Sequence, residues 1–285
     1  MNNTITPAQV GFRARYFYGG CLLLFTISLV SNTLFSQMSQ PVLIFPSVDI
    51  AYWLFHGLGI PSLATHSYLV SAILDMLLFF LPIIAIIVVH RRIYAIAYTL
   101  LILVYQITYS TYATHHYHAL VGVLFLSVPF WFEEGHRFVL LWNAARYYFF
   151  FIFSSAAIWK LLRGGLFEGH QMQRILMEQH VQYIYDYPRA IASQLAMYLI
   201  GHPALAQCLL IAGFILQFSF IGGFFTRKFD RIYLLLFLVF FAFNYVVMHI
   251  FSLELFIFCL VLLDWDKIER GYMTVANVPG SGSTY

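Results

Sequence analysis

Runs of about 20 apolar residues recur along this chain, and each has the length of a helix that crosses a lipid bilayer. Three of the longest cover residues 68–89, 204–225 and 232–249. Over the whole chain 61% of the residues are hydrophobic and only 9% are charged, a composition that soluble domains do not have. The aromatic share of 19% suits helices that place rings at the membrane interfaces. We therefore predict an all-α, polytopic integral membrane protein built as a helical bundle.

The apolar runs predict about eight transmembrane helices within residues 13–266. Residues 1–12 form a polar N-terminal tail, and residues 267–285 form a short cytoplasmic tail with a Gly/Ser-rich, partly disordered end. The first run differs from a secretory signal, because its apolar core is too long and lacks a small-residue cleavage site. The predicted spans cover residues 13–35, 68–89, 93–108, 119–131, 138–160, 204–225, 232–249 and 251–265.

Two connecting segments are long and too polar to cross the membrane. Residues 36–66 contain three prolines, among them Pro61, which we expect to act as breakers. Within that segment residues 47–57 predict a short amphipathic helix on the bilayer surface. Residues 163–203 are amphipathic and charged, and Pro188 can begin a second interfacial helix there as a first-turn proline.

The basic residues predict the orientation in the membrane. Eight spans place both termini on one side, and most arginines and lysines fall on that side, which the positive-inside rule assigns to the cytoplasm. We expect a plasma membrane or a bacterial inner membrane. The net charge of +3 indicates no nucleic-acid partner, because the basic residues occupy short loops. The cytoplasmic group comprises Arg13, Arg15, Arg91, Arg92, Arg137, Arg146, Arg227, Lys228, Arg231, Lys267 and Arg270, and the opposite group Lys160, Arg163, Arg174 and Arg189.

Lys160 ends an apolar, aromatic stretch that starts at Tyr148 and breaks at Gly164 and Gly165. An ammonium group in an apolar span is costly, so it marks either a membrane edge or a working site. In the first case Lys160 extends toward the interface and anchors the helix. In the second case apolar surroundings favour the neutral amine, which can serve as a base. Both interpretations stay open on this stretch alone.

Other polar residues fall on the same predicted membrane face as Lys160. Three histidines lie at the turn between the third and fourth spans, and His249 and Glu254 flank the turn between the last two. Asp75 lies about 10 Å below the outer end of its span, and Arg146 lies about 21 Å below Lys160 on one helix. Scattered interfacial residues would not be expected to converge in this way. The three histidines are His115, His116 and His118.

A metal site in this group is not expected. His115 and His118 would share a helical face, yet a single HHxH run without a second histidine box is a weak signal, and solvated loop histidines give the same pattern. Cys21, Cys208 and Cys259 lie inside apolar runs without metal-ligand spacing, so they predict packing residues and no disulfide.

Two motifs resemble a known family. The run YSTYATHHYHALVGVLFLSVPF is similar to the asparagine-His-Tyr-Tyr segment of the vitamin K-dependent γ-carboxylases. The run AAIWKLLRGGLFEGHQM is similar to the lysine segment of that family, although Leu166 stands where a tryptophan is usual and His115 replaces the asparagine. Bacterial relatives share the horizontally transferred transmembrane (HTTM) domain, and the likeness covers residues 10–265.

The resemblance implies a concrete chemistry. In the carboxylases a lysine deprotonates a reduced quinone at the lumenal membrane edge, and oxygen then converts the quinone to a base strong enough for glutamyl carboxylation. By motif position Lys160 would be that lysine and His116 the active-site histidine. The cofactor implied is a reduced, vitamin K-like quinone, and the activity a carbon–carbon lyase or a related oxidoreductase. The residues grouped as substrate- or cofactor-binding are His115, Tyr117, His118, His249, Glu254 and Asp75.

Three functions remain open at this stage. The first is a membrane enzyme that handles a quinone or another lipid at the extracytoplasmic face. The second is a non-enzymatic lipid- or quinone-binding protein or subunit in which the same groups only hold a ligand. The third, a transporter with Asp75, Arg146 and Glu254 as midplane groups, is disfavoured because the sequence has no internal repeat and no matched pair of broken helices.

Overall fold

A computed structural model describes residues 5–37, 54, 57–88, 92–112, 120–132, 135–248 and 252–269. All regular elements within these residues are helices, so the predicted all-α fold is confirmed. The chain divides into two compact units. Unit 1 comprises residues 1–145 and 254–285, and unit 2 comprises residues 146–253.

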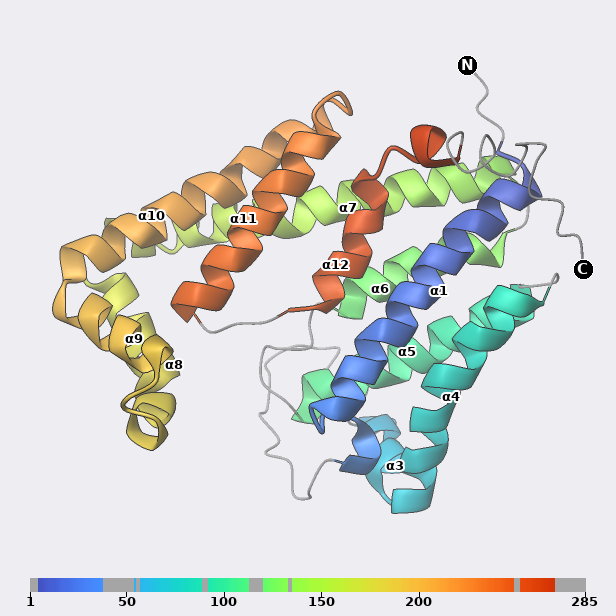
Figure 1. Cartoon of the computed structure of the whole chain (residues 1–285), viewed down its shortest axis with the longest axis horizontal. Helices are drawn as coiled ribbons and strands as arrows, with labels where there is room; N and C mark the ends of the chain where they lie inside the picture. Colours follow the sequence, from blue (N-terminus) through green and yellow to red (C-terminus); the bar gives the residue numbers. More distant parts are fainter. Residues whose placement is uncertain are drawn as a thin grey trace, which may run out of the picture. The chain divides into compact units, whose positions relative to one another are not determined.

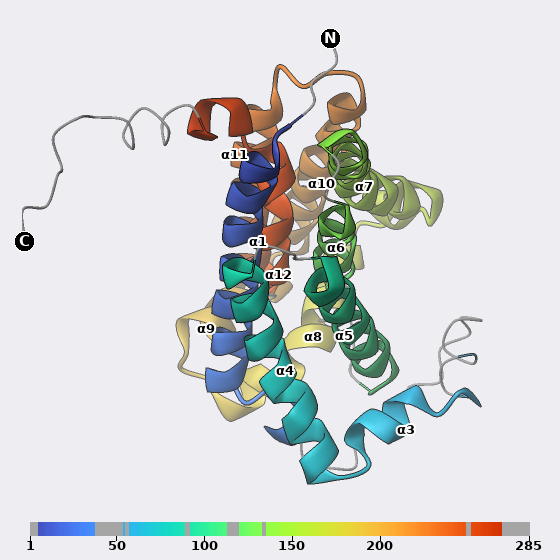
Figure 2. The same ribbon diagram turned by 90° about the vertical axis from the view of Figure 1, so that its right-hand side faces the viewer.

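Unit 1 combines helices from both ends of the chain. α1 (Pro7–Val30) packs against α4 (Tyr68–Ile87), which packs against α5 (Arg92–Tyr112). Figure 2 shows these helices with the short α3 (Ile60–Thr65) beyond the end of α4. α6 (Leu120–Ser127), continued by η3 (Val128–Trp131), contacts α5. The C-terminal α12 (Glu254–Phe258), continued by η6 (Cys259–Leu262), packs against α6 and α1.

α1 begins within the segment that the sequence predicted as a polar tail. Thr6 and Gln9 form a reciprocal capping box, in which each side chain accepts a hydrogen bond from the other residue's backbone N–H. Residues 7–12 of the expected tail are therefore helical, which corrects the expected start of the first helix at residue 13.

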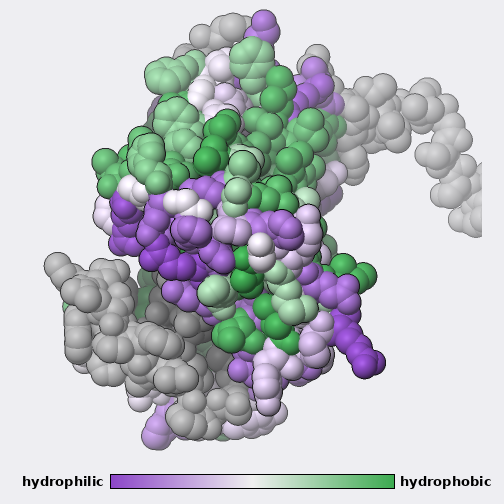
Figure 3. Space-filling view, turned by 90° about the vertical axis from the view of Figure 1, so that its left-hand side faces the viewer, coloured by the Kyte–Doolittle hydropathy of each residue, from purple (hydrophilic) through white to green (hydrophobic). Residues whose placement is uncertain are grey.

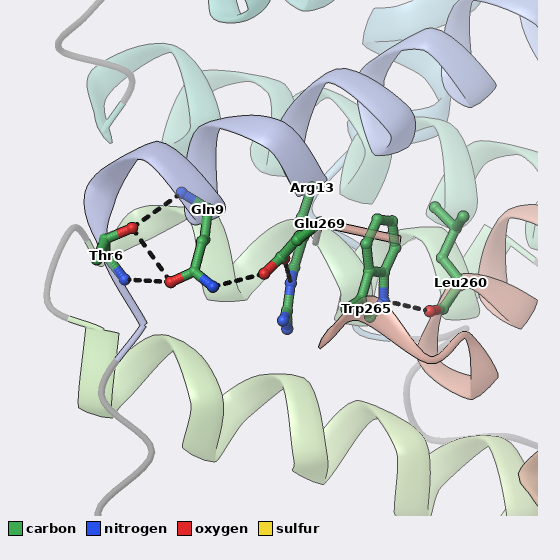
Figure 4. Close-up of polar contacts among 6 residues, drawn as sticks. All are labelled: Thr6, Gln9, Arg13, Leu260, Trp265 and Glu269. Atoms are coloured by element: carbon green, nitrogen blue, oxygen red, sulfur yellow. Dashed lines mark hydrogen bonds and ion pairs between the residues drawn. The ribbon is translucent and has the colours of Figure 1, made fainter. Parts of the chain in front are cut away.

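Arg13 lies in a buried cluster that joins the N-terminal helix to the C-terminal segment of unit 1 (Figure 4). Its Nε donates to Glu269 Oε1 at 2.9 Å, and Gln9 Nε2 donates to Glu269 Oε2 at 2.6 Å. The guanidinium also lies 5.3 Å from the centre of the Trp265 ring. The sequence analysis placed Arg13 among the basic residues of loops. In the structure Arg13 instead forms a buried ion pair with Glu269.

The segment after α1 corrects a second expectation. Gly59 has a left-handed φ of 70°, and Pro61 follows in the first turn of α3, where a proline costs no hydrogen bond. Pro61 therefore begins a short helix and does not break one. Of the amphipathic helix predicted at residues 47–57, only residues 54 and 57 lie within the described part of the chain.

Unit 2 contains the second half of α7 (Gly135–Leu162), a helix that starts in unit 1. η4 (Gly165–Phe167), α8 (Gln171–Asp186) and α9 (Ile191–Gly201) follow. α10 (Pro203–Ser219), continued by η5 (Phe220–Phe224), lies beside α11 (Asp230–Met248), and α8 and α9 lie at the end where α10 begins (Figure 1). Side chains from α8 to α11 form a common core, namely Met172, Leu176, Leu199, Ala206 and Val247.

The predicted start of the second interfacial helix is wrong. Pro188 lies in the turn between α8 and α9, and α9 begins three residues later at Ile191. The Ala190 N–H bonds to the Tyr187 carbonyl, so the chain must reverse direction before a new helix can start. Ile191 occupies the first helical position that was predicted for the proline.

Five helices in the described part of the chain are long and apolar enough to cross a membrane, as expected of a multi-pass membrane protein. The predicted number of eight is not confirmed. α6 and η3 have 8 and 4 residues, about 18 Å as an α-helix, and this is shorter than the hydrocarbon core of about 30 Å. Figure 3 shows hydrophobic surface above a hydrophilic band. The five helices are Pro7–Gln37, Tyr68–Ile87, Arg92–Tyr109, Pro203–Phe224 and Asp230–Met248.

Candidate functional site

Lys160 continues the buried stripe of α7. Phe150, Phe153 and Ala157 are almost fully buried, and Lys160 follows Ala157 at the i+3 spacing that keeps residues on one helix face. α7 ends two residues later at Leu162, and Gly164, two residues beyond that end, adopts a left-handed φ of 72°. The break that the sequence predicted at Gly164 is thereby confirmed. Lys160 thus lies in the last turn of α7, on the side that packs within unit 2.

α7 and the α10–η5 segment run antiparallel along a series of contacts. The contacts begin at Arg146, and each partner further along α7 meets a residue nearer the start of α10. This order fixes the level at which Lys160 meets its neighbours. The pairs are Arg146 with Thr226 and Asp230, Phe150 with Phe224, Phe153 with Phe220, Lys160 with Gln217, and Leu166 with Gln207.

The ammonium group of Lys160 is held by Gln217. Lys160 Nζ donates to Gln217 Oε1 at 2.7 Å, and Gln217 is only 6% exposed. Gln217 follows Pro203 by 14 residues and precedes Phe224 by 7, so it lies about 21 Å from the first residue of this apolar helix. A lysine that anchors a helix end would extend toward water. Lys160 instead reaches a residue well inside a membrane-spanning helix.

The direction of the Lys160 side chain follows from helix geometry. Cα–Cβ bonds in an α-helix tilt toward the N-terminus, so a side chain in the last turn starts back along the helix. Gly164 and Gly165, which follow the helix, have no side chains. The contact with Gln217 therefore needs no unusual backbone, and it depends on α10 packing closely against α7.

Small residues of η5 and α10 let aromatic rings of α7 and α11 pack closely against them. A Cβ at Gly223 would overlap the ring of Phe150, and a Cβ at Gly213 would lie 3.2 Å from the ring of Phe243. Ser154 is 4% exposed and its Oγ has no hydrogen-bond partner within the described residues. Such a buried hydroxyl is a rare feature in a packed interface and places a second polar group on the buried face of α7.

A second glutamine of α10 ties the turn after α7 in place. Gln207 Nε2 donates to the Leu166 carbonyl at 2.9 Å, and a carbonyl can only accept, which fixes the orientation of the amide. Gln207 Oε1 is consequently turned away from Leu166, is buried, and has no hydrogen-bond partner in the described part of the chain. Unit 2 thus presents a lysine, two glutamines and one serine along α7 and α10.

Arg146 is satisfied at the far end of the same helix pair. Its Nε donates to Asp230 Oδ2 at 2.9 Å and its Nη2 donates to the Thr226 carbonyl at 2.8 Å, while the guanidinium lies 4.7 Å from the centre of the Phe150 ring. The Arg146 side chain is 3% exposed and that of Asp230 17%. This arrangement closes the turn between α10 and α11 onto α7, so Arg146 has a structural role.

Asp75 also has a structural role, because its carboxylate is hydrogen-bonded within unit 1. Its carboxylate accepts from the backbone N–H groups of Phe35 and Ser36 at 3.2 and 2.8 Å, and from the Tyr105 hydroxyl. The Phe35 ring stacks on the Tyr105 ring with centroids 3.8 Å apart. Asp75 therefore fixes the turn after α1 against α4 and α5, and a buried carboxylate with three donors has little capacity for a ligand.

Glu254 differs from Asp75 in its surroundings. It is the first residue of α12, is 9% exposed, and its Oε2 has no hydrogen-bond partner within the described residues. The α12 helix packs tightly on α6, because a Cβ at Gly122 would lie 2.6 Å from the Phe258 ring. A buried carboxylate oxygen without a partner keeps Glu254 among the candidate site residues of unit 1.

Several sequence-predicted site residues cannot be placed. His115, His116, Tyr117, His118 and His249 lie outside the described residues. That Lys160 and His116 line one cavity together with at least one of His249 and Glu254 therefore stays a prediction. Among the described residues there is no group of three or more His, Cys, Asp or Glu that could hold a metal ion, and Cys21, Cys208 and Cys259 are free thiols.

Comparison with models of known protein families, with curated proteins and with solved structures finds no match to this chain.

Proposed function

We propose that this chain is a membrane-embedded enzyme that handles a quinone-type or other lipid-soluble substrate at its extracytoplasmic face, with Lys160 as the base. The observation that supports this proposal is the contact of Lys160 Nζ with Gln217 Oε1 inside an apolar helix. Ionisable groups within membrane spans are rare and usually have a function. A helix anchor would gain nothing from this position.

The substrate class comes from the family resemblance, and membership of the HTTM family is part of the proposal. Lys160 would accept a proton from a substrate hydroxyl, and Gln217 Oε1 would hold the ammonium that results. A reduced quinone would supply the oxygen-dependent chemistry when bound. An amine base beside an uncharged amide, in apolar surroundings, fits such a hydroxyl-bearing ring. On the resemblance alone, His116 is the proposed active-site histidine.

The alternative is a protein that binds a lipid or quinone without converting it. The buried, unpartnered Gln207 Oε1 favours it to a degree, because a ligand hydroxyl could donate to this acceptor without any chemistry. A transporter receives less support. Two of its three candidate midplane groups, Asp75 and Arg146, are already committed to partners of the chain.

We also propose about eight transmembrane helices with both termini in the cytoplasm of a bacterial-type or plasma membrane. The turn between α10 and α11 and the first turn of α11 carry Arg227, Lys228 and Arg231, whereas α8, which contacts α10 near its opposite end, carries one basic residue, Arg174. This asymmetry supports the positive-inside orientation. α8 and α9 would then lie at the outer face.

Cysteine labelling tests the orientation at the two ends of α10. In a variant whose native cysteines are replaced, Glu178→Cys is expected to react with a membrane-impermeant maleimide in intact cells, because Glu178 is exposed on α8. Lys228→Cys, which is exposed in the opposite turn, should react only after the membrane is opened. The reverse pattern would overturn the proposed orientation.

Ligand retention tests the proposed substrate class. We expect the protein purified in mild detergent to carry a quinone or a related hydroxyl-bearing lipid, detected by mass spectrometry, and Lys160→Met to lose about nine-tenths of it because a charged hydrogen bond is removed. The matched control is Arg163→Met, which removes a cation that lies 4.7 Å from the centre of the Trp159 ring at the helix end. It should retain the ligand.

Three results would count against the proposal. An unchanged lipid profile in Lys160→Met would separate Lys160 from any ligand site. Equal losses in Lys160→Met and Arg163→Met would attribute the effect to positive charge near the membrane surface and not to the buried contact. Retention of a quinone without turnover would favour the binding protein over the enzyme.

A further inference from the structure

We propose that Gln217 is a positioning residue that holds the Lys160 amine in place and keeps both of its charge states accessible. The contact is direct, at 2.7 Å between Nζ and Oε1, and Gln217 is nine-tenths buried. Only the amide oxygen can accept from an ammonium group, so the contact also fixes the orientation of the amide. The role of this contact in catalysis rests on the proposed function, whereas the effect of Gln217 on the Lys160 amine can be tested without a substrate.

The chemical nature of Gln217 matters more than its size. A carboxylate at this position would form a buried ion pair and hold Lys160 as an ammonium, which cannot accept a proton. A leucine would leave the amine without an acceptor in apolar surroundings and so favour the neutral form. An uncharged acceptor such as the Gln217 amide favours the ammonium form less than a carboxylate would and more than a leucine would. Such an acceptor suits an amine that must both gain and lose a proton.

The charged groups near Lys160 do not compete with Gln217. Arg163 lies over the Trp159 ring, and the half-exposed Arg174 pairs with Glu168. The sequence of α10 contains no Asp, Glu, Lys or Arg, and in α11 such residues occur only at Asp230 and Arg231, at the end where Asp230 binds Arg146. The partner that the structure gives Lys160 is therefore an uncharged one, and the charge state of the amine depends on this contact.

Chemical modification of the amine tests the proposal. The chain has three lysines, Lys160, Lys228 and Lys267, and the last two are exposed, so each can be followed by peptide mass spectrometry after brief treatment with a membrane-permeant acylating reagent at a mildly alkaline pH. Because only the neutral amine reacts, Gln217→Glu is expected to slow modification of Lys160 about tenfold or more relative to Lys228. Gln217→Leu is expected to accelerate it severalfold.

The two substitutions must act in opposite directions, which separates positioning from loosened packing. Loss of packing alone would expose Lys160 and accelerate its modification in both variants, and that result would overturn the proposal. Equal rates in all three proteins would overturn it as well. The control is Gln194→Leu, which makes the same exchange at an exposed glutamine of α9 and should leave the Lys160 rate within about twofold. If the opposite effects are found while Lys160→Arg keeps turnover, the positioning role stands and the base role fails.

Discussion

Replacing Arg146 with methionine is expected to lower the free energy of unfolding of the protein by about 3 kcal/mol. The change removes the partner of Asp230 and leaves the Thr226 carbonyl without the donor that Arg146 Nη2 supplies. The expected loss lies at the lower end for a broken buried ion pair, because the Asp230 side chain keeps 17% of its surface exposed and water can partly replace the guanidinium. Thermal or denaturant unfolding in detergent measures it.

The control for Arg146 is an exposed ion pair in the same unit. Arg174 pairs with Glu168, and their side chains are 53% and 50% exposed, so Arg174→Met should cost less than about 1 kcal/mol. A double variant, Arg146→Met with Asp230→Leu, should regain part of the loss because no charge is left buried alone. A loss from Arg146→Met as small as that from Arg174→Met would contradict the structural role given to this pair.

The membrane class and the positions of the long helices could be predicted from the sequence because they depend on local pattern. Apolar runs of about 20 residues at 68–89 and 204–225 correspond to α4 and to α10 with η5. The end of the helix that carries Lys160 was also predictable, since Gly164 permits the left-handed conformation that ends it. Local chemistry sufficed in each case.

Pairing across the fold could not be predicted from the sequence. Gln217 lies 57 residues after Lys160 in a run of apolar residues, and nothing in that run marks it as the partner of a lysine. Arg13 and Glu269 are 256 residues apart, so both read as ordinary charges near the chain ends. A glutamine inside a spanning helix is nevertheless uncommon, and that rarity was the available signal for Gln217.

The predictions at two prolines were wrong for a physical reason. The same residue is tolerated in a helical first turn and in a connecting turn, because its missing N–H is unneeded in both. Pro61 took the first role where a breaker was expected, and Pro188 took the second where a helix start was expected. The choice depends on whether the chain must reverse direction there, which the local sequence does not encode.

Among the described residues of unit 2, the proposed site consists of Lys160 and the residues of α7 and α10 around it. Asp75 and Arg146, which the sequence placed among the functional residues, are committed to contacts that hold each unit together. Glu254 keeps an unpartnered oxygen and so remains a candidate in its own unit. The central claim is therefore that Lys160 works as a base and not as a helix anchor.

Turnover of a reduced quinone by Lys160→Arg tests this claim most directly. Arginine keeps the positive charge and could still donate to Gln217 Oε1, so expression and folding should be preserved, yet it stays protonated at all working pH values and cannot act as a base. We expect a loss of at least about a hundredfold in turnover, the typical contribution of a general base. Lys228→Arg, the same change at an exposed lysine, should have no effect. Near-normal turnover by Lys160→Arg would contradict the account and return Lys160 to the role of an anchor.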